Sequence, residues 1–342
     1  MTAIDPATPT SRRTLLKMAG VAGAAASLAA AVGPRIFSPA IAGPAPKVRL
    51  AWTEVAACHS PMAFGVAKGF YARQGVEVEL FYQGASGQTL IQALATNKAD
   101  VGAGLVLDWL KPLEQGFDVK LFVGSHGGCQ RLMASKASGV TGLETIKGKR
   151  IATWEAGAPP KVAFSVTLAK AGLDPEQDVE WVYVPFDLVG EAVKRGDADL
   201  AAHMDPWAYN IQKTYGLTTI ADTQTGVYEG RVCCVLGANG PFLESNKDAV
   251  RRIAAANLEI HDYTASHPDE VAQWYADNLK PGMSVADLTA DLGSMVFHNH
   301  PVGAALTEQI AASIDDLKLT KVIDPTTDAA ELARHVTVDI LA

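Results

Sequence analysis

Strand-like and helix-like patterns of apolar residues alternate along the chain from about residue 47. Val76–Tyr82 alternates apolar with charged residues, which is typical of a half-buried strand, whereas Ala99–Gly104 is a short apolar run between turns. We predict further strands over Lys47–Thr53 and Val119–Val123. Helices are predicted over Pro61–Arg73, from the Gly84–Gly87 loop through Thr96 with Ser86 as N-cap, and over Asp108–Gln115.

The same order of elements begins again at Arg150. Predicted strands are Arg150–Trp154, Val179–Val184 and Asp199–His203, and predicted helices are Pro159–Ala171, Leu188–Arg195 and Pro206–Tyr215. Residues 94–102 and 192–200 have the same order of features: a helix end, a polar turn, Ala-Asp and a strand of small residues. This repetition indicates two similar lobes. Near-continuous apolar strands favour parallel sheets covered by helices.

The pattern beyond Asn246 is helical. Predicted helices are Asn246–Ser266, Pro268–Asn278, Ser284–Phe297, Val302–Asp316 and Ala329–Leu341. Two β-rich connections, near Cys129–Ser135 and Val232–Gly237, are expected to join the lobes.

The first 42 residues have the pattern of an export signal. Arg12 and Arg13 precede the small and apolar run Met18–Val32, and Ala40-Ile41-Ala42 follows as an A-x-A cleavage signature. The paired arginines resemble a twin-arginine (Tat) signal, and a Sec signal that contains two arginines is the alternative. Interruption by glycine and proline disfavours a membrane anchor. We expect the mature protein to begin at Gly43 in the periplasm.

Charge narrows the class of partner. The first 42 residues carry four basic residues and one acidic residue, so the remaining 300 carry a net charge of −11, against −8 for the whole chain. This acidic balance argues against nucleic acid or an anionic membrane as partner. After the signal, no apolar run approaches membrane-spanning length.

Four phrases, in order along the chain, resemble those of a known family. They are Ala67–Glu79 (AKGFYARQGVEVE), Leu94–Val101, Leu143–Ala152 (LETIKGKRIA), and Gly196–Asp199 followed by Asp205-Pro206. Together they resemble periplasmic substrate-binding proteins of ABC importers, in the branch that takes up nitrate, bicarbonate, taurine, alkanesulfonates and thiamine-precursor pyrimidines. The resemblance covers about residues 47–245.

The resemblance implies an α/β, type II periplasmic-binding-protein fold, with two α/β lobes joined by two crossing strands and a helical C-terminal tail. The expected division is a signal peptide over 1–42, one lobe over 43–130 and 237–342, and the other lobe over 131–236. It further implies a monomer that binds a small molecule, has no catalytic residue and no cofactor, and delivers its ligand to an inner-membrane ABC permease with its ATPase.

Open α/β sheets bind ligands beyond the carboxyl ends of their strands. The candidate ligand-binding residues at these ends are Thr53, Glu54, Cys58, His59, Gly84, Ser86, Leu105, Asp108, His126, Ala156, Gly157, Asp187, Asp205 and Trp207. The loops Gly84–Gly87 and Ala156–Pro159 lead into helix N-termini, where free N–H groups favour an anion or simply form tight turns.

Acidic residues outnumber Lys and Arg at these predicted strand ends, which favours a ligand with an ammonium or other donor group over bare nitrate. Asp108, Asp187 and Asp205 each lie at a helix start, where an N-cap role competes with ligand binding. For Asp187 we favour the cap, and for Asp108 and Asp205 the two interpretations are close.

The chain has four cysteines, Cys58, Cys129, Cys233 and Cys234. In an oxidising compartment, a bridge between Cys129 and Cys233 or Cys234 is the favoured arrangement. Cys58, His59, His126, Cys129 and His203 fall near the predicted cleft or hinge and could instead bind Zn or Cu, but no local ligand spacing supports a metal, and we predict none. His298 and His300 are expected at the surface.

These observations lead to a periplasmic solute-binding component of an ABC importer that captures a small organic ion, sulfonate- or taurine-like, nitrate-like or related. A protein that binds a pyrimidine or thiamine precursor, an enzyme on the same fold, and a periplasmic sensor partner are the alternatives. No G-x-S-x-G or metal-hydrolase motif is present in the sequence.

The export route is testable by conservative substitution. Replacing both Arg12 and Arg13 with Lys should leave precursor in the cytoplasm of a cell with a functional Sec pathway, because Tat recognition requires the arginine pair. Cell fractionation and immunoblotting measure this. Normal processing after Ala42 in that variant would show that the route is Sec.

Overall fold

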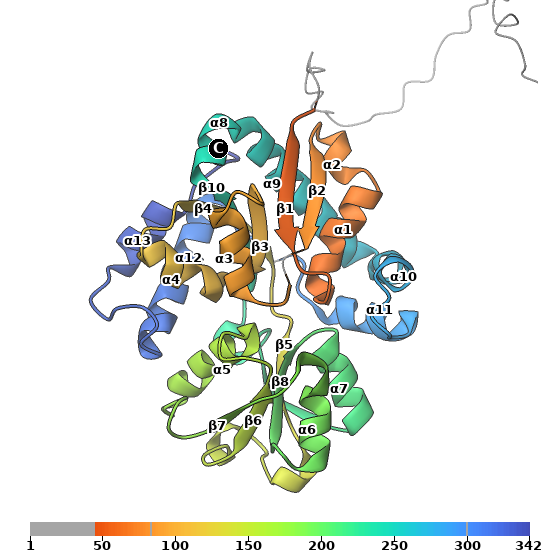
Figure 1. Ribbon diagram of the computed structural model, residues 1–342, viewed down its shortest axis with the longest axis vertical. Coiled ribbons are helices and arrows are strands. Elements are labelled where there is room, and N and C mark those ends of the chain that lie inside the picture. The colour runs from red at the N-terminus through yellow and green to blue at the C-terminus, as the bar shows by residue number, and fades with distance from the viewer. Residues whose placement is uncertain (1–44, 83, 299) are drawn as a thin grey trace, which may run out of the picture. The chain divides into compact units, whose positions relative to one another are not determined.

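The computed structural model describes residues 45–82, 84–298 and 300–342, so the predicted signal lies outside the described residues. Residues 43–342 form one compact unit. The described part contains two five-stranded sheets with helices on their faces (Figure 1). No helix in the described ranges has the length and apolar character needed to cross a membrane.

Sheet A has the strand order β2-β1-β3-β10-β4. Its strands are β1 (Lys47–Trp52), β2 (Glu77–Tyr82), β3 (Val101–Leu105), β4 (Val119–His126) and β10 (Cys234–Asn239). The helices of its lobe, called lobe A, are α1 (Ser60–Ala67), α2 (Phe70–Arg73), α3 (Gly87–Ala95), α4 (Val106–Glu114), α8 (Gly240–Ser245), α9 (Lys247–Ser266), α10 (Pro268–Asn278), α11 (Val285–Ser294), α12 (Gly303–Leu319) and α13 (Ala329–Val336).

Sheet B has the strand order β7-β6-β8-β5-β9. Its strands are β5 (Gln130–Ala134), β6 (Arg150–Thr153), β7 (Glu180–Tyr183), β8 (Leu200–Met204) and β9 (Thr218–Asp222). The helices of its lobe, called lobe B, are α5 (Pro159–Lys170), α6 (Val189–Arg195) and α7 (Trp207–Tyr215). The two-lobe prediction is confirmed.

Alternation along the strands of sheet B separates two cores. Leu132 and Leu200 pack with Phe164 of α5 on one face, and Met133 and Ala201 pack with the helices α6 and α7 on the other. Successive side chains of a strand point to opposite faces, so a strand apolar at every position needs helices on both sides. Figure 1 shows α5 on one side of this sheet and α6 and α7 on the other.

The prediction of purely parallel sheets is wrong. β10 runs antiparallel to β3 and β4, and β5 runs antiparallel to β8 and β9. These are the strands that follow the two connections between the lobes. A chain that crosses directly from one sheet into the other arrives without a βαβ turn, so its strand is inserted in the opposite direction.

Several elements differ from expectation. The predicted helix over 61–73 is two helices, because Gly69 has a positive φ of 75° that ends α1 and starts α2. The half-exposed edge strand β9 was not predicted. The last helix ends at Val336 rather than Leu341, since Thr337 bridges to Leu121 and the Val338 N–H donates to the Leu121 carbonyl.

Backbone hydrogen bonds hold the two crossing connections against their own lobes. Cys233 N–H donates to the carbonyl of His126, and the Asp205 N–H donates to the carbonyl of Cys129, both at 2.8 Å. The buried hydroxyl oxygen Oγ1 of Thr223 accepts from the N–H groups of Cys129, at 3.1 Å, and Gln130, at 3.0 Å. One side chain thus serves two buried donors of the first connection.

Removing that acceptor should destabilise the fold. Thr223→Val keeps the shape of the side chain but leaves two buried N–H groups unpaired, so we expect the free energy of unfolding to fall by about 2–4 kcal/mol in urea denaturation.

Thr219→Val on the neighbouring strand is the matched control. The Thr219 Oγ1 is buried without a hydrogen-bond partner among the described residues, so this variant should be neutral or stabilising. Equal losses of stability in both variants would contradict the role of Thr223.

Candidate functional site

A cavity lies where the two lobes meet. Lobe A lines it with residues at the ends of β1 and β3, at the start of α3 and at the start of β10, and lobe B adds residues at the start of β5 and α5 and at the end of β8. Its volume is about 40 Å³, and a cavity needs about 10–15 Å³ to hold one water molecule. In this conformation it therefore has room for an ion or a few waters.

Half of the predicted ligand-binding residues line this cavity. They are Thr53, Cys58, His59, Gly84, Ser86, Leu105 and Asp108. Gly157 lines a neighbouring pocket, to which Asp108 also contributes. Glu54, His126, Ala156, Asp187, Asp205 and Trp207 do not appear in the lining of either. The assignment of these residues to ligand binding stays a proposal.

Several lining residues were not among the candidates. Gln130, Cys129, Cys234 and Met204 come from the crossing connections and the end of β8. The sequence placed Cys129 and Cys234 in the connections, and Cys129 near the cleft or hinge, but neither was selected as a ligand-binding residue. Chain order alone does not reveal that the connections pass along the cavity wall.

Two buried polar groups of the lining lack partners. Thr53 Oγ1 and Gln130 Oε1 have no hydrogen-bond partner among the described residues, and Gln130 is only 3% exposed. An unpaired buried acceptor or hydroxyl destabilises the protein by about 1–3 kcal/mol, which a bound ligand would recover. These atoms are the clearest polar contacts that the cavity offers.

The cavity lining contains an acidic side chain and, among the described residues, no Lys or Arg. None of the residues that line this cavity in the described part of the chain is Lys or Arg, and Asp108 is its one carboxylic acid. Burial, and then the charges of Cys233 and Glu155, raise the pKa of Asp108 to about 8. The Asp108 carboxyl also faces the N-terminus of α3, where Oδ2 lies 2.5 Å from the position of a Cβ on Gly87. At neutral pH Asp108 is mostly protonated, and so able to donate a hydrogen bond.

The two predicted helix starts differ. Ser86 caps α3 as predicted, because its Oγ accepts from the Gln88 N–H at 3.2 Å. The helix α5 begins with Pro159 and Pro160, which have no N–H, so the loop at Ala156–Pro159 offers fewer donors to an anion than we expected. Of the two helix starts, the one at α3, with Gly84 and Ser86, therefore offers more N–H donors to an anion.

The predicted acidic anchors have other partners or positions. Asp205 is fully buried and accepts from Arg131 Nε at 2.9 Å and from the Tyr209 N–H at 3.1 Å. It therefore forms an ion pair and binds the first turn of α7, whose N-cap is Pro206. Burial raises its pKa to about 6, against the opposing effect of Arg131. The prediction that Asp187 caps a helix is wrong. Asp187 is exposed in a short 3-10 turn, and the N-cap of α6 is Leu188.

Trp207 lies in an aromatic group at the carboxyl end of sheet B. Its ring centroid is 5.1 Å from Phe186 and 6.1 Å from His203, and Trp154 packs against both. His203 is neutral, because Nδ1 accepts from the Met204 N–H, Nε2 contacts the Phe186 carbonyl, and burial lowers its pKa to about 4. This group supports the wall of lobe B beside the cavity.

The cysteines are all free, so the predicted bridge from Cys129 to Cys233 or Cys234 is absent. Hydrogen bonds from Cys129 and Cys234 lower the pKa of the Cys58 thiol. Hydrogen bonds with Cys233, and then with Cys58, raise the pKa values of Cys129 and Cys234. Burial lowers the pKa of His126, but the neighbouring Cys58 outweighs it and the value rises to about 9.

His298 is exposed and His300 is partly exposed, and both contact Asp262. Neither contributes to the cavity.

Residues 56–271 match the family model described as NMT1/THI5 like. Among curated protein sequences, none matches this chain.

Solved structures share the fold. The alkanesulfonate-binding protein SsuA from Xanthomonas axonopodis pv. citri, bound to MOPS, is 17% identical, with a TM-score of 0.71 over 87% of this chain and 100% of that one. The periplasmic nitrate-binding protein NrtA from Synechocystis PCC 6803 is 15% identical, with a TM-score of 0.70 over 86% of each chain.

A ligand-binding component of an ABC-type import system from Staphylococcus aureus, solved with zinc bound, is 11% identical, with a TM-score of 0.67 over 85% of this chain and 99% of that one. At these identities the likeness establishes the fold, and the predicted type II periplasmic-binding-protein fold is confirmed.

The pKa of Asp108 gives a pH-dependent prediction. Between pH 4 and 8 the folded state retains a proton that the unfolded state releases, so this residue destabilises the fold progressively as the pH rises. Asp108→Asn should raise the unfolding free energy by more than about 1 kcal/mol at pH 8 and by much less at pH 5, as each pKa unit corresponds to about 1.4 kcal/mol.

Urea denaturation at both pH values measures the effect. Asp187→Asn removes the same charge from an exposed turn and serves as control, with a smaller change expected. If Asp108→Asn changed the free energy of unfolding equally at pH 5 and pH 8, the pKa of this carboxyl would not be raised in the folded state.

Proposed function

Because the chain belongs to the NMT1/THI5-like family, we propose that it is the solute-binding component of an ABC-type importer. It acts in the periplasm as a monomer and delivers its ligand to an inner-membrane permease with its ATPase. Export follows the Tat route. The lobes divide close to the expected bounds of 43–130 with 237–342 and 131–236, with β5 from Gln130 in lobe B and β10 from Cys234 in lobe A. The observation that carries the proposal is a cavity lined by both lobes with unpartnered buried polar atoms.

Ligand capture uses closure of the lobes about the two connections. Arg131 on β5 binds Asp205 in lobe B and reaches Asp291 of α11 in lobe A at 3.4 Å. Lys213 of α7 pairs with Asp287 of α11 at 2.5 Å. These ion pairs join the lobes beside the cavity, so they stabilise the closed form that retains a ligand.

The lining selects a small ligand with hydrogen-bond donors. Gln130 Oε1 accepts such a donor, Thr53 Oγ1 completes a second contact, and Asp108 binds an amine as carboxylate or an oxyanion as acid. Amino-sulfonates and pyrimidines carry donors that match this set of acceptors better than nitrate does, and to admit them the lobes would have to separate beyond this conformation, whose cavity is about 40 Å³. A nitrate ion would have only the α3 N-terminus and neutral side chains to hold it.

Binding is tested by thermal shift of the purified protein against taurine, alkanesulfonates, pyrimidines, bicarbonate and nitrate. A ligand present at 100 times its Kd should stabilise the fold by about 2.7 kcal/mol. We expect a donor-bearing compound to do so and nitrate to have no effect. The ligand recovered after incubation should be chemically unchanged, and a converted product would favour an enzyme on this fold.

Calorimetry on variants locates the site. Gln130→Ala should weaken binding by about 2- to 10-fold, the equivalent of one neutral hydrogen bond. Gln224→Ala is the matched control, because Gln224 donates to the Gly128 carbonyl next to the same connection but does not line the cavity. Equal affinity in both variants and the parent would place the ligand elsewhere.

A further inference from the structure

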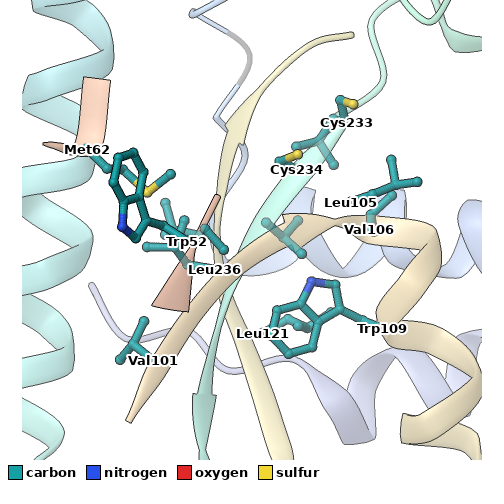
Figure 2. Close-up of a cluster of buried hydrophobic side chains, with 14 of the residues drawn as sticks. Trp52, Met62, Val101, Leu105, Val106, Trp109, Leu121, Cys233, Cys234 and Leu236 are labelled. Atoms are coloured by element: carbon teal, nitrogen blue, oxygen red, sulfur yellow. The ribbon is translucent and has the colours of Figure 1, made fainter. Parts of the chain in front are cut away.

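All four cysteines of the chain meet at one buried place. Cys58 follows β1, Cys129 lies between β4 and β5, and Cys233 and Cys234 lie at the start of β10. Each is 5% exposed or less. Figure 2 shows Cys233 and Cys234 beside Leu105 and Val106, where β3 passes into α4. We call these four residues the thiol cluster.

The donor atoms lie close enough for a shared ion. The ligand atoms of Cys58, His126 and Cys129 are all within 4.8 Å of one another, and so are those of Cys58, His59 and Cys234. Metal–thiolate bonds of about 2.3 Å place two sulfurs of a tetrahedral site about 3.8 Å apart. Shifts of the order of 1 Å would therefore bring these donors to ligating distance.

His126 is already oriented as a metal ligand. It is fully buried, its Nδ1 contacts the Gly127 carbonyl, and its Nε2 has no nitrogen or oxygen partner among the described residues. Metal-binding histidines commonly donate one ring N–H to a carbonyl and present the other nitrogen to the ion. The ligand nitrogen of His126 lies within 4.8 Å of the sulfurs of Cys58 and Cys129.

His59 differs in this respect. Its Nδ1 accepts from the Thr53 N–H at 3.2 Å, so the ring proton of the neutral form is on Nε2. A ligating Nε2 would have to lose that proton. The structure therefore favours the group of Cys58, Cys129 and His126 over the group that includes His59.

We propose that three residues of the thiol cluster bind a thiophilic d10 metal ion, Zn²⁺ or Cu⁺. Cys58 and Cys129 act with His126, and Cys234, whose sulfur lies within 4.8 Å of the Cys58 sulfur, is the fourth donor. Sulfur and imidazole select such ions, and the donor set includes no carboxylate that would suit Mg²⁺ or Ca²⁺. A metal ion also supplies the positive charge that deprotonated thiols need in a lining without Lys or Arg.

The site would connect the ligand cavity with the connections between the lobes. Cys58, Cys129 and Cys234 all line the cavity, so a bound ion forms part of its wall. Cys58 and Cys234 belong to lobe A, whereas Cys129 directly precedes β5 of lobe B. The ion would thus hold lobe A against the first connection. The proposal does not rest on the identity of the transported solute.

Metal binding is measured on the reduced full-length protein by competition with a chromophoric chelator. Zn²⁺ is titrated in one arm and Cu⁺ under anaerobic conditions in another. We expect one equivalent of at least one ion to bind, and Cys58→Ser to weaken it at least about 100-fold. Bound ion should also protect Cys58 from alkylation, and chelator should remove that protection.

Adjacent residues provide the matched pair. Cys234→Ser removes a proposed ligand and should weaken binding at least about 10-fold, whereas Cys233→Ser should change it less than about 3-fold. Circular dichroism confirms that each variant is folded.

Three results would overturn the proposal. They are no binding of either ion by the folded, reduced protein, an unchanged affinity in Cys58→Ser, and a disulfide between cluster cysteines in protein isolated from the periplasm without reductant. The solute assays are run with and without chelator, so that failure of the metal site and failure of solute binding are seen separately.

Discussion

The hydrogen bonds at the two connections between the lobes fix the geometry on which the cavity depends. Thr223 Oγ1 accepts from two N–H groups of the first connection, and the Cys233 N–H of the second donates to the carbonyl of His126. These bonds hold each connection in place where it leaves one sheet and enters the other. Because the strands that follow insert antiparallel, both connections pass along the cavity, and Cys129, Gln130 and Cys234 line it.

Ion pairs on buried aspartates reinforce the contact between the lobes. Arg131 is shared between Asp205 and Asp291, and Asp316 of α12 is shared between Lys170 of α5 and Arg231. A buried pair is costly to form but more costly to break, since removing one partner leaves an uncompensated charge. These pairs therefore favour one defined closed arrangement, and Asp205 serves this arrangement rather than the cavity lining.

The chain shares its fold with sulfonate- and nitrate-binding proteins, and its cavity has a chemistry of its own side chains. Its lining has one carboxylic acid, several thiols, one histidine and no Lys or Arg in the described residues. Burial keeps Asp108 largely protonated at neutral pH, which lowers the charge that a ligand meets. A shared fold thus leaves ligand class open, because the ligand contacts are side chains that vary independently of the sheets.

The sequence determined the local elements and the lobe plan. Apolar periodicity predicted strands such as β1 and β2 and helices such as α10. The cap at Ser86 was also predicted, because caps, like periodicity, depend on neighbours along the chain. Strand ends gave Thr53, Cys58 and Asp108 as lining residues. The paired prolines of α5 were visible in the sequence, and their missing N–H groups could have been weighed there.

Tertiary structure alone decided the direction of the crossing strands, the lining role of Gln130, and the partner of Asp205. It also decided that four thiols from three distant segments meet while remaining free. These outcomes depend on which residues are brought together across gaps of about 70–170 positions. No periodicity in the chain encodes such distances, because they follow from how two whole lobes pack about their connections.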